Sequence, residues 1–566
     1  MIDTPGPRAH RTLPALAALA LGAATALVPL SAQAAPLGDR GPVVRTESGL
    51  IRGESTREGQ QFLGVPYAAR PVGELRWKAP RPAPAWRGVR DATRFADKCV
   101  QTKSWDPGYE EPSYTEDCLA LNVYVPRKQP AGSKNGVQKN GVQKNGVRKN
   151  GMPRNGKLPV MVWFHGGGLT AGAGQDIVPD EFANSTGTVV VSVNYRLGAL
   201  GFLATPGLDA EAKDRTSGNF GLQDQQQALR WVRANARHFG GDAARVTLAG
   251  ESAGGLSVCT QLASPTARGL FRAGIIQSGA YNDCAARPKK TAAEQGTAFA
   301  AKLGCKDAGT ALACLRGKSS KEILEAQNGF SWSPVVGGSF LPVQPFAAFK
   351  EGKAARVPVL NGANKDEGRL FAFSAFEGRG RPLTTEAYPA AVRAYFGPAL
   401  GEKVAARYPA SAHRSPTIAL GTAIGDQLFA CSALRLNRAA ATHTTVHTYE
   451  FADRTSPPFA SMRNQPVPFD FGATHVNEVQ YLFKHFGLDT PLNAAQRKLS
   501  RQMVEYWGSF IRDGRPEAAG QPDMPTQNRT PGTVLSLKTD SAGGNTFDSK
   551  VGSDHLCDLW DAAATA

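Results

Sequence analysis

Residues 245–254, with the sequence RVTLAGESAG, contain the only G-x-S-x-G motif in the chain. The branched and apolar residues at 246–249 predict a short buried strand, and the residues after Ser252 favour a helix. A strand that turns into a helix this sharply pushes the serine to a tip with strained backbone angles, where larger residues than Gly250 and Gly254 would collide. The motif therefore predicts that Ser252 is presented as a nucleophile, with the positive end of a helix beside it.

Apolar strands and helical segments alternate on both sides of this motif. Strands are expected at 159–164, 188–193, 273–278, 357–362 and 445–451, and residues 219–238 have apolar side chains at helical spacing. Continuous apolar strands separated by helices predict a mostly parallel sheet covered on both faces. The expected fold class is therefore α/β, with a central mostly parallel sheet flanked by helices in a single large domain, residues 35–566. Ligands in such folds bind at the carboxyl ends of the strands.

A glycine run, His165-Gly166-Gly167-Gly168, follows the first of these strands. Attack on a carbonyl group places negative charge on its oxygen, and backbone N–H groups that glycines allow to approach closely can stabilise that charge. We expect the N–H groups of Gly167, Gly168 and Ala253 to form such an oxyanion hole. A phosphate-binding loop is the alternative, but no Lys-Ser/Thr pair of the Walker type follows the glycines.

A serine nucleophile needs a base and an orienting carboxylate, which in chains with this motif follow the serine in the order acid, then histidine. The acid is expected in residues 361–368 (NGANKDEG), directly after a predicted strand, where Asp366 and Glu367 are chemically equivalent. His475 lies in a small-residue loop (471–475, FGATH) from which an imidazole can reach the serine. Position alone leaves several histidines open: His413, His443, His447, His475, His485 and His555.

Residues 1–34 have the pattern of a removable export signal. Arg8 and Arg11 precede a nearly uncharged stretch at 12–30, and small residues at 32 and 34 predict cleavage after Ala34. A membrane anchor is the alternative, but the stretch is short and contains Pro29 near its end. No later segment approaches 18 unbroken apolar residues, so we expect no stable membrane insertion. In an exported chain, eight cysteines without a C-x-x-C pair indicate disulfides rather than a metal site.

The net charge of +17, from 65 basic and 48 acidic residues, is concentrated in one segment. Residues 127–157 hold nine Lys or Arg and no acid, within repeats of KNGVQ. Asn-Gly pairs favour turns, and so polar a segment cannot bury enough surface to order itself. We interpret 127–157 as a solvated low-complexity basic insertion between strands, and its confinement to one loop disfavours nucleic-acid binding. Weak attraction to an anionic surface is the other possibility for this segment.

Together these motifs resemble those of the type-B carboxylesterases, which include the cholinesterases and some fungal lipases. The resemblance covers nearly the whole chain after the leader and implies an α/β-hydrolase fold. It rests on residues 61–68 (QFLGVPYA), 116–123 (EDCLALNV), 250–255 (GESAGG), 364–368 (NKDEG) and 472–478 (GATHVNE). Because the acid of this family is the glutamate of its motif, the resemblance selects Glu367 over Asp366, and it selects His475 as the base. Val476 departs from the family pattern, where many members have glycine.

The resemblance also implies three disulfides and leaves Cys259 and Cys284 either paired or free. The implied pairs are Cys99–Cys118, Cys305–Cys314 and Cys431–Cys557. Each would stabilise the fold by about 2–4 kcal/mol.

Substrate-binding residues are suggested by the same resemblance. Trp105 lies in the 99–118 loop, where cholinesterases carry a choline-binding tryptophan, but its larger separation from Cys118 favours a packing role. Phe330 resembles part of the family's acyl pocket, and Glu251, next to the serine, is a third candidate.

The resemblance implies a secreted serine carboxylesterase that cleaves a small-molecule ester through an acyl-enzyme on Ser252, without a metal or organic cofactor. A lipase acting on longer chains is one alternative, disfavoured because the 99–118 loop is acidic rather than apolar. A non-catalytic binding module of the same fold is the other, disfavoured because Ser252, Glu367 and His475 are all present. The natural ester, the cleavage of amides or carbamates and the oligomeric state stay open.

Overall fold

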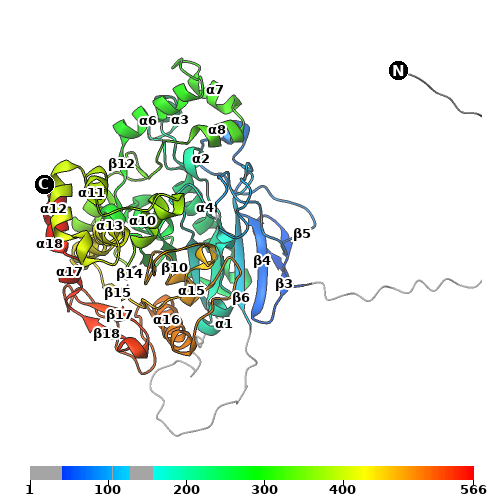
Figure 1. Cartoon of the computed structure of the whole chain (residues 1–566). Coiled ribbons are helices and arrows are strands. Elements are labelled where there is room, and N and C mark those ends of the chain that lie inside the picture. Colours follow the sequence, from blue (N-terminus) through cyan, green and yellow to red (C-terminus); the bar gives the residue numbers. More distant parts are fainter. Residues whose placement is uncertain (1–40, 105, 128–156, 464, 566) are drawn as a thin grey trace, which may run out of the picture. The chain divides into compact units, whose positions relative to one another are not determined.

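The computed structural model describes residues 41–104, 106–127, 157–463 and 465–565 (Figure 1). The predicted leader at 1–34, Trp105 and all but the two ends of the predicted insertion at 127–157 lie outside the described residues. The chain from Gly41 onwards forms one compact unit.

An eleven-stranded sheet runs through the described part of the chain, in the order β18-β17-β15-β14-β11-β10-β7-β9-β6-β4-β3. The strands from β9 to β17 are parallel to one another, whereas β3, β4 and β6 at one edge and β18 at the other pair antiparallel. The bounds are β3 Glu54–Ser55, β4 Gly59–Pro66, β6 Ala120–Pro126, β7 Leu158–Phe164, β9 Val189–Val193, β10 Gly241–Glu251, β11 Ala273–Gln277, β14 Val359–Asn364, β15 Val446–Phe451, β17 Val534–Leu537 and β18 Thr546–Asp548. The predicted mostly parallel α/β sheet is confirmed.

Smaller pairings lie outside this sheet. They are β1 (Val43–Arg45) with β2 (Leu50–Arg52) and β5 (Val89–Asp91), β12 (Arg287–Pro288) with β13 (Val335–Val336), and β8 (Ile177–Val178) with β16 (Lys484–His485).

Both faces of the central sheet are buried, as the continuous apolar strands predict. In β7, Val160 and Val162 pack into the cluster that contains α4 and α5, while Met161 and Trp163 pack into the cluster that contains α1 and α16. This alternation follows from the twofold period of side chains along a strand. Helices therefore cover the sheet on both sides and leave the carboxyl ends of its strands to form the site described below.

The helices differ in length and in how they end. Residues 219–238, predicted as one helix, form α4 and a short 3₁₀ turn that Gly240 closes in the left-handed conformation (φ 77°). The bounds are α1 Asp180–Thr186, α2 Gly198–Phe202, α3 Pro206–Glu211, α4 Phe220–Asn235, α5 Ala253–Ala263, α6 Lys289–Lys302, α7 Ala311–Gly317, α8 Ser320–Ala326, α9 Pro345–Lys350, α10 Arg369–Ala375, α11 Tyr388–Phe396, α12 Pro398–Arg407, α13 Pro416–Gly425, α14 Cys431–Ala441, α15 Val479–Leu482, α16 Ala494–Asp513, α17 Val551–Asp554 and α18 Cys557–Thr565.

A π-helical segment, Asp426–Ala430, joins α13 to α14 in one continuous helical stretch. This stretch, Pro416–Ala441, is the one described helix that is long and apolar enough by composition to cross a membrane. Its most apolar window is 83% buried inside the protein, as expected of a core helix.

Four disulfides use all eight cysteines. The three pairs that the family resemblance implies are present, and Cys259 and Cys284, which the sequence left open, form the fourth. The pairs are Cys99–Cys118, Cys259–Cys284, Cys305–Cys314 and Cys431–Cys557.

Candidate active site

Ser252 stands between β10 and α5 with φ 56° and ψ −122°, the strained tip that its motif predicts. Its backbone N–H donates to the carbonyl oxygen of Gln277 at 2.9 Å, which ties the tip to the neighbouring strand β11. A Cβ atom added to Gly254 would lie 1.9 Å from the carbonyl oxygen of Phe164, and one added to Gly250 would lie 2.5 Å from Gly254. Both glycines of the motif are therefore required by backbone contact.

The loop after β7 supplies unpaired backbone N–H groups beside the serine. Gly167 and Gly168 have φ 92° and 62°, and the N–H of Ala171 donates to the Gly167 carbonyl at 3.0 Å. Within the described ranges, the N–H groups of Gly167 and Gly168 donate to no protein acceptor. Ala253 is the first residue of α5, so its N–H has no acceptor within that helix. Gly167, Gly168 and Ser252 line one cavity, and Ala253 directly follows Ser252 in the chain, so the N–H groups of Gly167, Gly168 and Ala253 lie at or next to this cavity.

Of the two adjacent acids that sequence could not separate on chemistry, Glu367 faces the histidine. His475 is 4% exposed, and its Nδ1 lies 2.5 Å from a carboxylate oxygen of Glu367. The other oxygen of Glu367 accepts from the backbone N–H of Asn364 at 2.8 Å. Asp366 instead points away and binds the Arg454 guanidinium through two bonds of 2.9 Å. This arrangement fixes the imidazole ring with Nδ1 toward the carboxylate and leaves Nε2 facing the cavity.

The Nε2 atom of His475 faces a second carboxylate. It lies 3.3 Å from Oε1 of Glu251, and no hydrogen bond joins the imidazole to the Ser252 hydroxyl, although both side chains line the same cavity. Burial alone would lower the pKa of His475, but Glu251, Glu367 and Glu478 raise it to about 9. Burial in turn raises the pKa of Glu251 to about 8, although the imidazolium opposes the shift. The charges of Glu251 and His475 are thus strongly linked.

The cavity around these groups has a volume of about 740 Å³ and is lined by both apolar and polar side chains. The ring centroids of Phe371 and Phe429 lie 5.0 Å and 4.9 Å from that of His475, which makes the wall beside the imidazole apolar. The lining also includes hydrogen-bonding side chains, among them Lys103, Ser104, Asp106, Ser461 and His485. Among the described residues, no group of three or more His, Cys, Asp or Glu is arranged to hold a metal ion.

The predicted substrate-binding residues have different outcomes. Glu251 lines the cavity. Phe330 does not line this cavity: its ring packs edge-on against Phe299 of α6 at 5.4 Å and beside Trp332, on the main core cluster. Its role in substrate binding stays a prediction. Trp105 lies outside the described residues.

Two features of the site were not predicted. The π-helical segment Asp426–Ala430 places Leu428 and Phe429 in the cavity wall. Hydrophobic periodicity in the sequence does not predict such a segment. Val476, next to the histidine, has φ 75°, a conformation that is rare for a β-branched residue. The glycine that many members of the resembling family have at this position was the available signal for this strained backbone.

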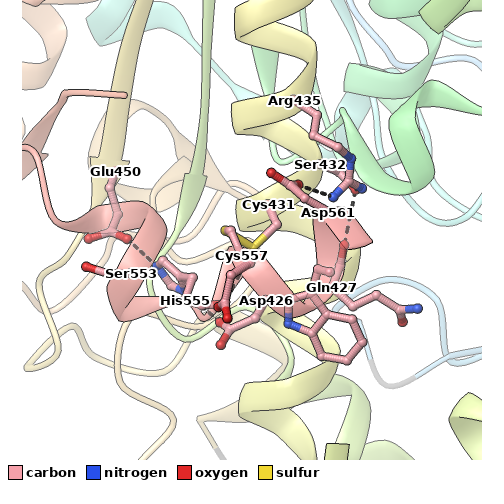
Figure 2. Close-up of a disulfide and its surroundings, with 12 residues drawn as sticks. Asp426, Gln427, Cys431, Ser432, Arg435, Glu450, Ser553, His555, Cys557 and Asp561 are labelled. Carbon is pink, nitrogen blue, oxygen red and sulfur yellow. Dashed lines mark hydrogen bonds and ion pairs between the residues drawn. A yellow bond between two sulfur atoms is a disulfide. The ribbon is translucent and has the colours of Figure 1, made fainter. Parts of the chain in front are cut away.

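Behind the cavity, a buried histidine is held by two carboxylates (Figure 2). His555 lies 2.5 Å from Asp426 through Nδ1 and 2.6 Å from Glu450 through Nε2. Burial alone would lower the pKa of His555, but these carboxylates raise it to about 10. The Cys431–Cys557 disulfide lies beside this cluster and joins α14 to α18. The cluster does not line the cavity, and its effect is to fix the C-terminal segment against the helix that carries Phe429.

Comparisons with known proteins agree with this geometry. The model of the Carboxylesterase family matches residues 40–553. A cocaine esterase of Oryctolagus cuniculus is 34% identical over 512 residues, which cover 86% of this chain and 90% of that protein. A fumonisin B1 esterase of Sphingopyxis macrogoltabida is 34% identical over 549 residues, which cover 93% and 89%. Among solved structures, a PNB esterase with 29% identity has a TM-score of 0.72 and covers 91% of this chain and 99% of its own. The chain therefore belongs to the carboxylesterase family, has the α/β-hydrolase fold and is a carboxylic ester hydrolase.

Proposed function

We propose that this protein is exported and hydrolyses small-molecule carboxylic esters through an acyl-enzyme on Ser252. The observation that carries this proposal is the 2.5 Å contact between Glu367 and Nδ1 of His475, in a ring whose Nε2 faces the cavity that Ser252 and the glycine loop line. Glu367 would hold the ring in the tautomer that leaves Nε2 free to accept a proton.

In the proposed cycle, His475 accepts the hydroxyl proton of Ser252 while the serine oxygen attacks the ester carbonyl carbon. The N–H groups of Gly167, Gly168 and Ala253 stabilise the negative carbonyl oxygen. His475 then donates the proton to the leaving alcohol, and the acyl group remains bonded to the serine. Water repeats these steps: its proton passes through His475 back to the serine oxygen, and the carboxylic acid leaves.

The walls of the cavity favour an ester with one apolar chain and one polar or short group. Phe371 and Phe429 offer the apolar chain a surface, and the polar side chains of the lining offer hydrogen bonds. The relatives named for cocaine, fumonisin B1 and pyrethroids suggest tolerance of varied alcohol and acyl groups in this family. A lipase acting on long chains and a non-catalytic binding module are the competing functions.

Export is supported by the leader pattern at 1–34 and by four disulfides, which form and persist outside the reducing cytosol. N-terminal sequencing of protein recovered from the culture medium tests the leader, and a mature chain that starts at residue 35 is expected.

Hydrolysis of nitrophenyl esters of increasing acyl length tests the catalytic proposal. Ser252→Ala should lower kcat/KM by about 10⁴-fold or more. Ser374→Ala is the matched control, because Ser374 lines the same cavity but bonds only the carbonyl of Leu370, and it should keep most of the activity. An optimum at long acyl chains would favour the lipase. A folded wild-type protein that cleaves none of these esters would contradict the proposal and favour the binding module.

A further inference from the structure

The segment η5 (Tyr281–Cys284), which follows β11 in the chain, has a strained backbone. Asn282, Asp283 and Cys284 have φ 50°, 55° and 56°, so three consecutive residues with side chains adopt the left-handed conformation. Each such residue brings its Cβ too close to a backbone carbonyl, and runs of them persist only where the surroundings hold them. Tyr281 and Asn282 also line the active-site cavity. The strained η5 turn is therefore part of the wall that a substrate meets.

A disulfide holds the end of this turn. Cys284 is bonded to Cys259, and both cysteines are fully buried. Cys259 lies in α5, the helix whose N-terminal end carries Ser252. The backbones also touch nearby, because a Cβ added to Gly279 would lie 2.3 Å from Gly255 of the same helix. The η5 turn is thus covalently fixed to the helix of the nucleophile.

An ion pair holds the middle of the turn from the other side. The single Nε–H of Arg435 is shared between the two oxygens of the Asp283 carboxylate, at 3.0 Å and 3.2 Å. Arg435 lies on α14 and is itself fixed by Ser432 at 2.9 Å and by Asp561 of α18 at 3.0 Å (Figure 2). The turn cannot relax to ordinary backbone angles without breaking either this pair or the disulfide.

The turn contacts one of the phenylalanine rings that line the cavity beside His475. The ring of Tyr281 lies 5.7 Å from that of Phe429, which stacks on Phe371 at 5.5 Å. Both phenylalanine rings contact the ring of His475. A shift of the turn would therefore change the space available to an apolar chain, while Glu367 would still hold the imidazole.

We propose that the η5 turn is a specificity-determining element, and that Cys284 and Asp283 are positioning residues that set how long an apolar chain of the ester the cavity accepts. This inference rests on the proposed function. The two braces of the turn are the Cys259–Cys284 disulfide and the Asp283–Arg435 ion pair. With both braces intact, Tyr281 and Asn282 would limit the apolar chain of the ester to a compact group. Release of the braces would let the turn relax outward and admit longer chains, in the acyl or the alcohol part of the ester.

The test compares the wild type with Cys259→Ala/Cys284→Ala, which leaves no free thiol. Cys305→Ala/Cys314→Ala is the matched control, because it also removes one disulfide but no part of the cavity wall. One substrate series lengthens the acyl chain of nitrophenyl esters, and a second lengthens the alcohol of acetate esters. The ratio of kcat/KM for the longest to the shortest ester should rise about tenfold or more in one series, the size of effect that a pocket wall exerts on a few methylene groups. The control should leave both ratios within about twofold of the wild type.

Should the double variant fail to fold, Asp283→Asn removes the ion pair while keeping a residue type that tolerates the left-handed conformation. Asp558→Asn is its control, because Asp558 lies on α18, pairs with Arg407 instead of Arg435 and does not line the cavity. A rise of the same ratio in Asp283→Asn alone supports the proposal. An unchanged ratio in the brace variants, or an equal rise in the controls, overturns it. If the folded wild type hydrolysed none of these esters, both the proposed function and this inference would be overturned.

Discussion

The Glu251→Gln variant should extend ester hydrolysis to lower pH. Glu251 is 4% exposed, and its Oε1 lies 3.3 Å from Nε2 of His475, the nitrogen that accepts the serine proton in the proposed cycle. A carboxylate at this place favours the imidazolium, and it contributes to the rise of the His475 pKa to about 9, against the opposing effect of burial. A protonated imidazole cannot act as a base. Replacing the carboxylate by a neutral amide of the same shape should therefore lower the pKa at which the base is switched on.

The size of the shift follows from the distance. Two unit charges 3.3 Å apart at an effective dielectric constant of about 20 interact by about 5 kcal/mol, or roughly three to four pKa units. This figure is an upper bound, because burial raises the pKa of Glu251 itself to about 8, so that Glu251 is partly protonated near neutral pH. We expect the acidic limb of the kcat/KM profile to move down by about one to three pH units.

The assay is hydrolysis of nitrophenyl acetate between about pH 5 and pH 10 by the wild type, Glu251→Gln and the control Glu294→Gln. Glu294 is exposed on α6 and does not line the cavity, so its variant should keep the wild-type profile. An acidic limb of Glu251→Gln that stays in place, or moves to higher pH, would refute the view that Glu251 sets the proton affinity of the base.

Three further predictions concern stability, each measured by denaturant unfolding. Gly254→Ala should lower the free energy of unfolding by about 3 kcal/mol, because its Cβ would lie 1.9 Å from a carbonyl oxygen. Gly317→Ala, whose Cβ would meet nothing within 4 Å, should leave stability nearly unchanged, and equal losses in the two variants would contradict the packing argument. Val476→Gly should be more stable than Val476→Ala by about 1 kcal/mol, because only glycine adopts φ 75° without strain, and the reverse order would be inconsistent with strain there. Folding raises the pKa of His555 above its unfolded value to about 10, so its stabilisation of the folded state is complete below about pH 6.5 and is lost as the pH rises through about 10. A His555→Gln variant should lack most of this decline in the free energy of unfolding, and an unchanged decline would assign it to other groups.

The parts of the fold and site that sequence predicted are those encoded in contiguous residues. Each of three segments is encoded within a few consecutive residues: the strand before Ser252, the glycine run and the loop of His475. Each forms where it was expected. The order of the strands was not predictable in this way, because β4 and β6 pair antiparallel across a long stretch of chain. Strand partners are chosen by packing between distant segments, which a local pattern does not contain.

Neighbouring residues of equal chemistry were separated only by the fold or by the family resemblance. Asp366 and Glu367 differ by one position, and the turn of the backbone after β14 sends one toward Arg454 and the other toward His475. The Cys259–Cys284 pairing stayed open for the same reason, since no spacing rule selects it. Phe330, a substrate-binding candidate from the family resemblance, does not line the described cavity, and its packing against Phe299 of α6 is a contact that a local pattern does not contain.

The burial and the pKa values of the carboxylates around His475 could not be predicted from the sequence. Glu251, Glu367 and Glu478 are all nearly or fully buried close to one imidazole, and burial raises the pKa of both Glu251 and Glu478. Glu478 is held by hydrogen bonds from Gln277 and Asn364, and Glu367 by a backbone N–H, whereas Oε1 of Glu251 has no hydrogen-bond donor and faces the ring alone. Burial, together with the charges of Glu478 and Glu367, favours the protonated form of Glu251 and raises its pKa to about 8. In the proposed cycle, the imidazolium that forms when the ring takes the serine proton lies beside the Glu367 carboxylate, and the ionised form of Glu251 at 3.3 Å would add to its stabilisation. A carboxylate at this place would stabilise the imidazolium of the transition state more than a neutral ring, which is the condition for an interaction to accelerate the chemical step.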